Sequence, residues 1–353
     1  MKRLQFNCNT KAAPALYFTL ILSAVALAGC TPVADTRALL EADLRPPVFL
    51  SIAVNDSRSL ALEFSEPVEY CARSYSCSPA LTLEPAGPQA SDQHLQLSFR
   101  DAMQPGTEYS LECSVRDKSG NTHTVLAKFY GFNPAIPAVR LNEITTQGSA
   151  SNPDKVELLV LEDGNTAGLC FIDGTRDLIR NCKIFPAIEV AAGEYIVIHC
   201  RPAGRPDEID ETESPLQCSA EEASMEAWDV WLDGASGLSG NNGVLSVYSH
   251  SNGELLDGFL YSNRTSASDE YYRGFGSRAT MDRADQLWME GGWTAAGRLI
   301  APEDAVNPDD STATRSMCRP PGAADTDCAA DWYIVDTRQA SFGTENSTVL
   351  YEP

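Results

Sequence analysis

Few residues of the chain have the type and spacing that enzyme chemistry requires. The four histidines are scattered, and none has a second histidine or cysteine at metal-ligand spacing: His94, His123, His199 and His250. No Gly-x-Ser-x-Gly nucleophile elbow or phosphate-binding glycine-rich loop is present. Glu143 and Glu157 could form a carboxylate pair for hydrolysis, but we favour hydrogen bonding to backbone at strand ends. The sequence therefore predicts no catalytic residue, metal or cofactor, and a protein that is not an enzyme.

The first 29 residues have the parts of a secretory signal. Lys2, Arg3 and Lys11 flank an apolar run, from about residue 15 to 27, that is too short to span a bilayer. The segment ends in Leu27-Ala28-Gly29-Cys30, which resembles the lipobox of bacterial lipoproteins. The resemblance implies cleavage before Cys30, lipidation of its thiol and a lipidated tether over residues 30–46. A plain signal peptide with a chance cysteine is the alternative.

The lipobox resemblance implies that the protein is located outside the cytoplasm and attached to a membrane. The lipoprotein resemblance favours the outer membrane over the inner, because Thr31 and not aspartate follows the cysteine. The formal net charge of −23 argues against nucleic acid as a partner, since phosphate binding needs clustered lysine and arginine. It also argues against lying flat on anionic lipid. We therefore expect membrane attachment through the N-terminal lipid alone, with a protein or glycan partner.

Export makes disulfides the default state of the remaining cysteines. None of them lies in a Cys-x-x-Cys pair, and six lie in the second half of the chain, where fifteen connectivities are possible. We expect neighbours to pair, because each bridge would close a short surface excursion: Cys170–Cys182, Cys200–Cys218 and Cys318–Cys328. Three cysteines lie in the first half, so one of them, Cys71 or Cys77, would stay unpaired.

The first half of the chain reads as short strands with alternating apolar residues. Residues 94–100 alternate strictly, and the alternation over 108–115 places Cys113 on the core face. The segments 62–68, 105–109 and 117–121 (LEFSEPV, PGTEY, DKSGN) resemble bacterial Ig-like domains of the S-layer type. The resemblance implies an Ig-like spacer domain over residues 47–133, with a linker over 134–138.

The second half, residues 139–353, resembles the lamin-tail domain, which is an Ig-like β-sandwich. The resemblance rests on the order of weak motifs, among them VRLNEI at 139–144, KVELL at 155–159 and the Asn252-Gly253 hairpin turn. Two insertions depart from that family, at about residues 202–233 and 262–310, and a Ser219-x-x-Glu222 capping box predicts a short helix in the first. The predicted fold class is all-β, with two Ig-like β-sandwich domains in tandem after a lipoprotein signal.

The second insertion contains the residues that could bind a ligand. Aromatic side chains next to arginine and glycine can stack on sugars or anchor a protein partner: Tyr271, Tyr272, Arg273, Trp288 and Trp293. The alternative, which we favour, is that the aromatic residues pack onto the sandwich. The function predicted is a lipid-anchored, non-catalytic binding or scaffold protein of the envelope. The second candidate is an accessory subunit of an envelope or extracellular hydrolase of the nuclease type.

Overall fold

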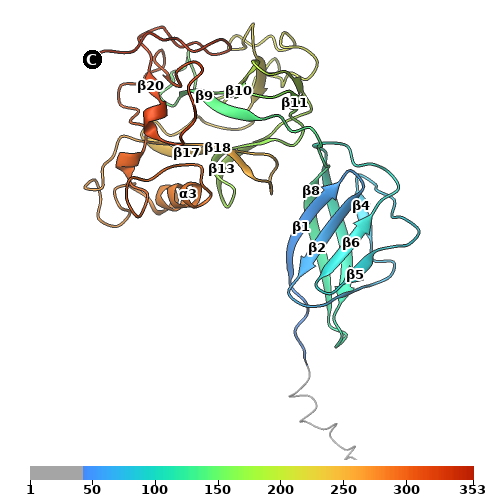
Figure 1. Cartoon of the computed structure of the whole chain (residues 1–353). Helices are drawn as coiled ribbons and strands as arrows, with labels where there is room; N and C mark the ends of the chain where they lie inside the picture. Colours follow the sequence, from blue (N-terminus) through green and yellow to red (C-terminus); the bar gives the residue numbers. More distant parts are fainter. Residues whose placement is uncertain (1–42) are drawn as a thin grey trace, which may run out of the picture.

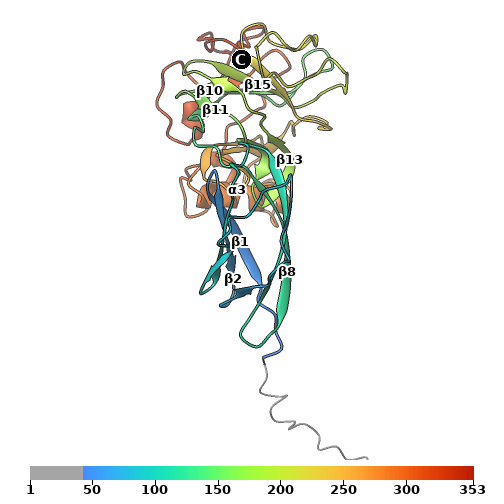
Figure 2. The ribbon, with the colours of Figure 1, turned by 90° about the vertical axis from the view of Figure 1, so that its right-hand side faces the viewer.

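The computed structural model describes residues 43–353, which form two β-domains one after the other along the chain (Figures 1 and 2). Strands hold 35% of the residues and helices 6%, so the all-β prediction is confirmed. The predicted signal, Cys30 and most of the tether lie outside the described residues. Among those described, no helix has the length and apolarity to cross a membrane.

The first domain has two antiparallel sheets. One has the strand order β1 (Phe49–Asp56), β2 (Ser59–Phe64), β6 (His94–Ser98) and β5 (Gln89–Ser91). In the other, β7 (Glu108–Arg116) pairs along one edge with β8 (Thr122–Tyr130) and along the other with β3 (Glu69–Tyr70) and β4 (Ser76–Ser78).

The core of the first domain follows from the alternation of apolar and polar residues. Along β7, Tyr109, Leu111, Cys113 and Val115 are buried, while the residues between them face outward. Leu95 and the other apolar residues of β2 and β6 face them in one cluster. The inward position predicted for Cys113 is confirmed.

The second domain packs a larger sheet against a smaller one. The larger has the order β16 (Trp228–Trp231), β15 (Tyr195–His199), β10 (Lys155–Val160), β9 (Val139–Thr145), β19 (Met317–Cys318) and β20 (Tyr333–Ile334). The smaller has the order β13 (Leu178–Ile184), β12 (Cys170–Thr175), β17 (Asn242–Tyr248) and β18 (Leu255–Ser262). A short pair, β11 (Gly164–Asn165) and β14 (Glu189–Val190), lies apart from them. One apolar cluster fills the space between the two main sheets.

Both predicted insertions contain regular structure that the sequence analysis missed. The segment 202–233 holds β16, which pairs in parallel with β15 and forms the edge of the larger sheet. The prediction of a short helix at Ser219-x-x-Glu222 is wrong, because that segment forms irregular structure and a turn. The segment 262–310 holds α3 (Arg278–Met289), which packs on the smaller sheet, and the 3-10 turn η1 (Pro302–Asp304); a second such turn, η2 (Ala329–Asp331), follows later.

The two domains meet in close backbone contact. The Asn133 side chain donates from Nδ2 to the carbonyl oxygens of Asn165, at 2.7 Å, and Ala167, at 2.9 Å. Gly106 of the first domain has φ +66°, and a Cβ there would lie 2.7 Å from the backbone nitrogen of Gly168. Only glycine fits such an approach, so this residue sets how closely the domains pack.

Candidate binding pocket at the domain junction

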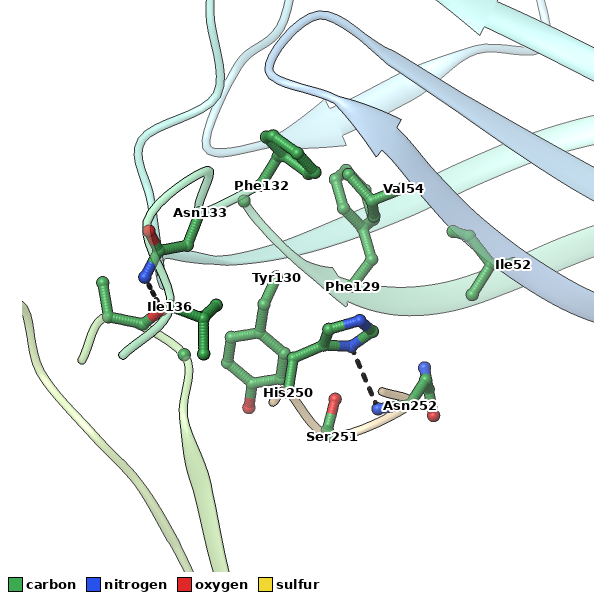
Figure 3. Close-up of a pocket in the computed structure, with 13 residues that line it drawn as sticks. Ile52, Val54, Phe129, Tyr130, Phe132, Asn133, Ile136, His250, Ser251 and Asn252 are labelled. Atoms are coloured by element: carbon green, nitrogen blue, oxygen red, sulfur yellow. Dashed lines mark hydrogen bonds between the residues drawn. The ribbon is translucent and has the colours of Figure 1, made fainter. Parts of the chain in front are cut away.

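A pocket opens where the first domain approaches the turn between β17 and β18 of the second (Figure 3). It contains about 580 Å³ of empty space, part of which is open to solvent. Its residues come from four stretches of the chain: β1, the segment from the end of β8 into the linker, residues 167–168, and residues 250–252. Domain interfaces are a preferred location for ligand pockets, so this one is the candidate functional site.

The first domain and the linker supply the apolar side of the pocket. Ile52 and Val54 lie two residues apart on β1, so the alternation of the strand places both side chains on the same face. Phe129, near the end of β8, is buried, and Phe132 and then Ile136, in the linker, follow it along the chain. The result is a wall of aliphatic and aromatic carbon.

The β17–β18 turn supplies the polar side. His250 Nδ1 accepts a hydrogen bond from the backbone N–H of Asn252 at 3.3 Å, so the proton of the neutral imidazole lies on Nε2. Burial, assisted by the charge of Arg176, lowers the pKa of His250. Arg176 also donates to the carbonyl oxygen of Gly253 at 2.7 Å and so holds the turn in place. At pH 7 the turn therefore offers a neutral imidazole N–H donor at the pocket.

Tyr130, the last residue of β8, lies between the two sides. Its hydroxyl donates to Glu108 Oε2 at 3.0 Å, and burial followed by that hydrogen bond raises the pKa of Tyr130 to about 12. The phenol is therefore also neutral. The pocket presents an apolar face and neutral hydrogen-bonding groups, which suits recognition of an uncharged ligand.

Glu143 and Glu157 lie opposite each other on the adjacent strands β9 and β10. Glu143 accepts hydrogen bonds from the Ser316 hydroxyl and from the backbone N–H of Ser341, and Glu157 accepts one from the backbone N–H of Gly343. Both glutamates have an exposed fraction of 0%, so no substrate reaches them. They lie within the strands and not at strand ends as predicted, and they attach the C-terminal segment to the sheet.

His199, unlike His250, packs inside the second domain. Its Nε2 lies 2.6 Å from Asp229 Oδ1, and its ring stacks on Trp231 with the centroids 3.9 Å apart. Burial lowers the pKa of His199 against the opposing effect of Asp229. The side chain is 2% exposed and forms part of the packing between β15 and β16.

The five residues of the predicted ligand loop differ in burial and in the groups they contact. Trp293 is 2% exposed, meets Phe259 edge-to-face and donates from Nε1 to the Asp304 carbonyl at 2.9 Å. Trp288, on α3, packs half-buried against the same core. Tyr271 is 85% exposed, and its ring centroid lies 6.5 Å from that of Tyr272. Arg273 forms an ion pair with Asp285.

The predicted cysteine pairs lie in different surroundings. Cys170 and Cys182 are on adjacent strands, with their sulfur atoms 3.4 Å apart. Cys200 and Cys218 contact the carbonyl oxygens of Ile198 and Asp207, at 3.6 and 3.2 Å. Cys318 is buried in β19, and the sulfur of Cys328 lies 3.1 Å from the Thr326 hydroxyl. All three pairings stay predictions.

Two groups of acidic residues bring three carboxylates within 4.8 Å of one another: Asp43, Glu66 and Asp117, and Asp257, Asp325 and Asp327. In the first group, the Asn121 amide donates to Asp117 Oδ2 at 2.7 Å. In the second, the buried Arg319 supplies a positive charge, with Nη1 2.7 Å from Asp325 Oδ1. Donors of the protein itself therefore satisfy carboxylates in both groups.

Fold and site together define an all-β, two-domain protein with a neutral pocket at the junction of its domains. Residues 137–334 match the family described as the TP_1001 protein second domain. The match spans more than half of the chain, which therefore belongs to this family.

A relative from Treponema pallidum (strain Nichols), described as an uncharacterized protein, is 27% identical over 158 residues. That alignment covers 45% of this chain and 40% of the relative, so the chain spans less than half of the relative's length. Among solved structures, the N-terminal part of the bacterial S-layer protein SbsC is 19% identical, with a TM-score of 0.23 over 51% of this chain and 44% of that one. Domains 1–6 of SbsC are 14% identical, with a TM-score of 0.22 over 66% of this chain and 42% of that one.

The sequence does not predict the junction pocket. Its residues come from the stretches 52–54, 129–136, 167–168 and 250–252, which are separated along the chain. Of these, only the Asn252-Gly253 turn carried a signal, and it indicated a hairpin and not a site. The packing of the two domains, which no local pattern encodes, brings the segments together.

Proposed function

We propose that the chain is a lipid-anchored, non-catalytic binding protein of the cell envelope that recognises an uncharged glycan unit. In this proposal Cys30 carries the lipid, and the first domain is the spacer between the membrane and the junction pocket. The observation that carries the binding function is the pocket itself, which has an apolar side from β1 and β8 and a neutral polar side at His250. The outer membrane and the lamin-tail relationship remain part of the proposal.

The chemistry of a sugar ring suits this pocket. A pyranose has an apolar C–H face that packs on aromatic rings such as Phe132, and hydroxyl groups around its edge. His250 Nε2–H and the Ser251 hydroxyl are neutral partners for those hydroxyls. A charged ligand would lose hydration in the pocket without gaining an opposite charge from these groups.

The test is saturation-transfer NMR of the purified full chain with N-acetylglucosamine and methyl β-glucoside as probes. We expect transfer to at least one probe, and we expect the Phe132→Ala variant to reduce affinity about tenfold or more, the equivalent of ~1.4 kcal/mol. Tyr271→Ala is the matched control, because Tyr271 is an exposed aromatic residue of the predicted ligand loop. Loss of binding in Tyr271→Ala with unchanged Phe132→Ala would move the site to that loop. Absence of transfer to either probe would overturn the glycan proposal.

The second candidate, an accessory subunit of a hydrolase system, predicts a different result. Crosslinking in intact cells would then recover a nuclease-type or other hydrolase in a constant ratio to this protein. A binding protein that acts alone would be recovered without such a stoichiometric partner.

A further inference from the structure

Cys170 and Cys182 lie together on one face of the hairpin formed by β12 and β13. In the register of these strands, Cys170 is opposite Ile184 and Ile172 is opposite Cys182, so the two cysteines are diagonal neighbours. Their sulfur atoms are 3.4 Å apart. A disulfide needs a sulfur–sulfur bond of ~2.05 Å and Cβ atoms ~3.8 Å apart, and diagonal neighbours in a sheet start farther apart than that. Closing the bond therefore needs side-chain rotation together with a local approach of β13 to β12.

The two thiols have different environments. Cys182 is exposed, whereas Cys170 is buried. The hydrogen bond between the two sulfurs lowers the pKa of Cys182, and the same bond together with burial raises the pKa of Cys170. The exposed sulfur is thus the one that an oxidant can reach and the one that ionises first.

No other pair of cysteines among residues 43–353 has a sulfur–sulfur hydrogen-bond contact. The sulfurs of Cys200 and Cys218 contact separate backbone carbonyls, and that of Cys328 contacts the Thr326 hydroxyl. The local geometry therefore singles out one of the three pairs that spacing along the chain suggested.

We propose that Cys170 and Cys182 form a disulfide in the mature protein, and that it is made by exchange with a protein disulfide of an extracytoplasmic thiol oxidase. The Cys182 thiolate attacks one sulfur of the oxidant and displaces the other as a thiolate. The Cys170 thiol then loses its proton and attacks the mixed disulfide. The Cys170–Cys182 bond forms, and the oxidant leaves with both sulfurs reduced after taking up two electrons and two protons.

This inference rests on the proposed function, which includes export of the protein from the cytoplasm. The disulfide would link the edge strand β13 covalently to β12. The pair also lies near Tyr130: after burial and Glu108, the two sulfurs add to the upward shift of its pKa.

The experiment is a tryptic map of the full chain isolated from the envelope under non-reducing conditions, with free thiols alkylated first. Cleavage after Lys155, Arg176, Arg180 and Lys183 places the two cysteines in separate peptides, 156–176 and 181–183. We expect these peptides to be joined, to separate on reduction, and to be joined again when the reduced protein is treated with oxidised glutathione. Alkylated Cys170 and Cys182 in the envelope protein would overturn the proposal.

Matched variants separate a specific bond from general oxidation. Cys182→Ser should lose the joined peptides and melt several degrees lower than the oxidised protein, whereas Cys318→Ser, which removes a different buried-strand cysteine, should keep the joined peptides. If glutathione fails to join 156–176 to 181–183 in the purified protein, the geometric argument is wrong irrespective of where the protein resides. Failure of the glycan test would leave both peptide results unchanged.

Discussion

At the scale of single residues, the two buried glutamates on β9 and β10 make the stability of the second domain depend on pH. Burial raises the pKa of Glu143, and burial together with the charge of Glu143 raises the pKa of Glu157 well above the ordinary value of 4.5. The folded state therefore keeps protons that the unfolded state releases as pH rises past 4.5. The contribution of the pair to the free energy of unfolding is then largest below pH 4.5 and falls as pH rises through the folded-state pKa values.

Glu143→Gln should remove much of this penalty. The glutamine oxygen can take the place of Oε1 and still accept from the backbone N–H of Ser341 and from the Ser316 hydroxyl. The Ser341 hydroxyl, which donates to Oε2, can rotate to accept from the new amide. We expect the variant to gain stability relative to the wild type as pH rises from 4 to 8, by on the order of 1 kcal/mol. Thermal unfolding at several pH values measures the difference, with the exposed Glu345→Gln as control. A difference that shrinks toward pH 8 would contradict the linkage argument.

At the scale of elements, local patterns predicted the strands whose two faces differ. β7 and the β17–β18 hairpin were read correctly because period-two alternation and Asn252-Gly253 are signals within a few residues. α3 was missed although Ser277 caps it and the spacing of Met281, Ala284 and Leu287 is helical. The composition of that segment, which is rich in glycine, arginine and aromatic residues, says little about its structure. β16 was missed for a different reason: a four-residue parallel edge strand has no local signature and depends on β15 beside it.

The contact between the two domains requires glycine at position 106, and adding a single methyl group there tests this requirement. Gly106→Ala would place a Cβ 2.7 Å from the Gly168 nitrogen, where only backbone can yield. Gly87→Ala is the matched control, since Gly87 has φ +69° and nothing within 4 Å of its added Cβ. Both substitutions force alanine into the left-handed region, at about 1–2 kcal/mol. The Gly106 variant should lose a further ~1–3 kcal/mol from overpacking.

Urea unfolding measures the stability of both variants, and small-angle X-ray scattering reports whether the domains separate. We expect a larger radius of gyration for Gly106→Ala alone, together with weaker binding of the glycan probes. Equal effects of the two substitutions would mean that the domain contact contributes nothing to stability.

At the scale of the whole molecule, the proposed function requires that both domains be held at a membrane by one modified residue. Cys30→Ser removes the thiol that would carry the lipid, while leaving the apolar run and its positive flank intact. We expect the wild type to enter the detergent phase on Triton X-114 partition and the variant to stay in the aqueous phase, because several acyl chains on one residue are needed for stable anchoring. Cys8→Ser, which alters the other cysteine of the first 30 residues, should partition like the wild type. If Cys30→Ser still enters the detergent phase, the attachment is not through this thiol.

Protease treatment of intact cells then shows which side of the outer membrane the two domains occupy. Cleavage of the wild type while a periplasmic control survives would place the junction pocket outside the cell, where glycans of other cells are within reach. Protection until the outer membrane is opened would confine its ligands to the periplasm and make peptidoglycan fragments the next probes.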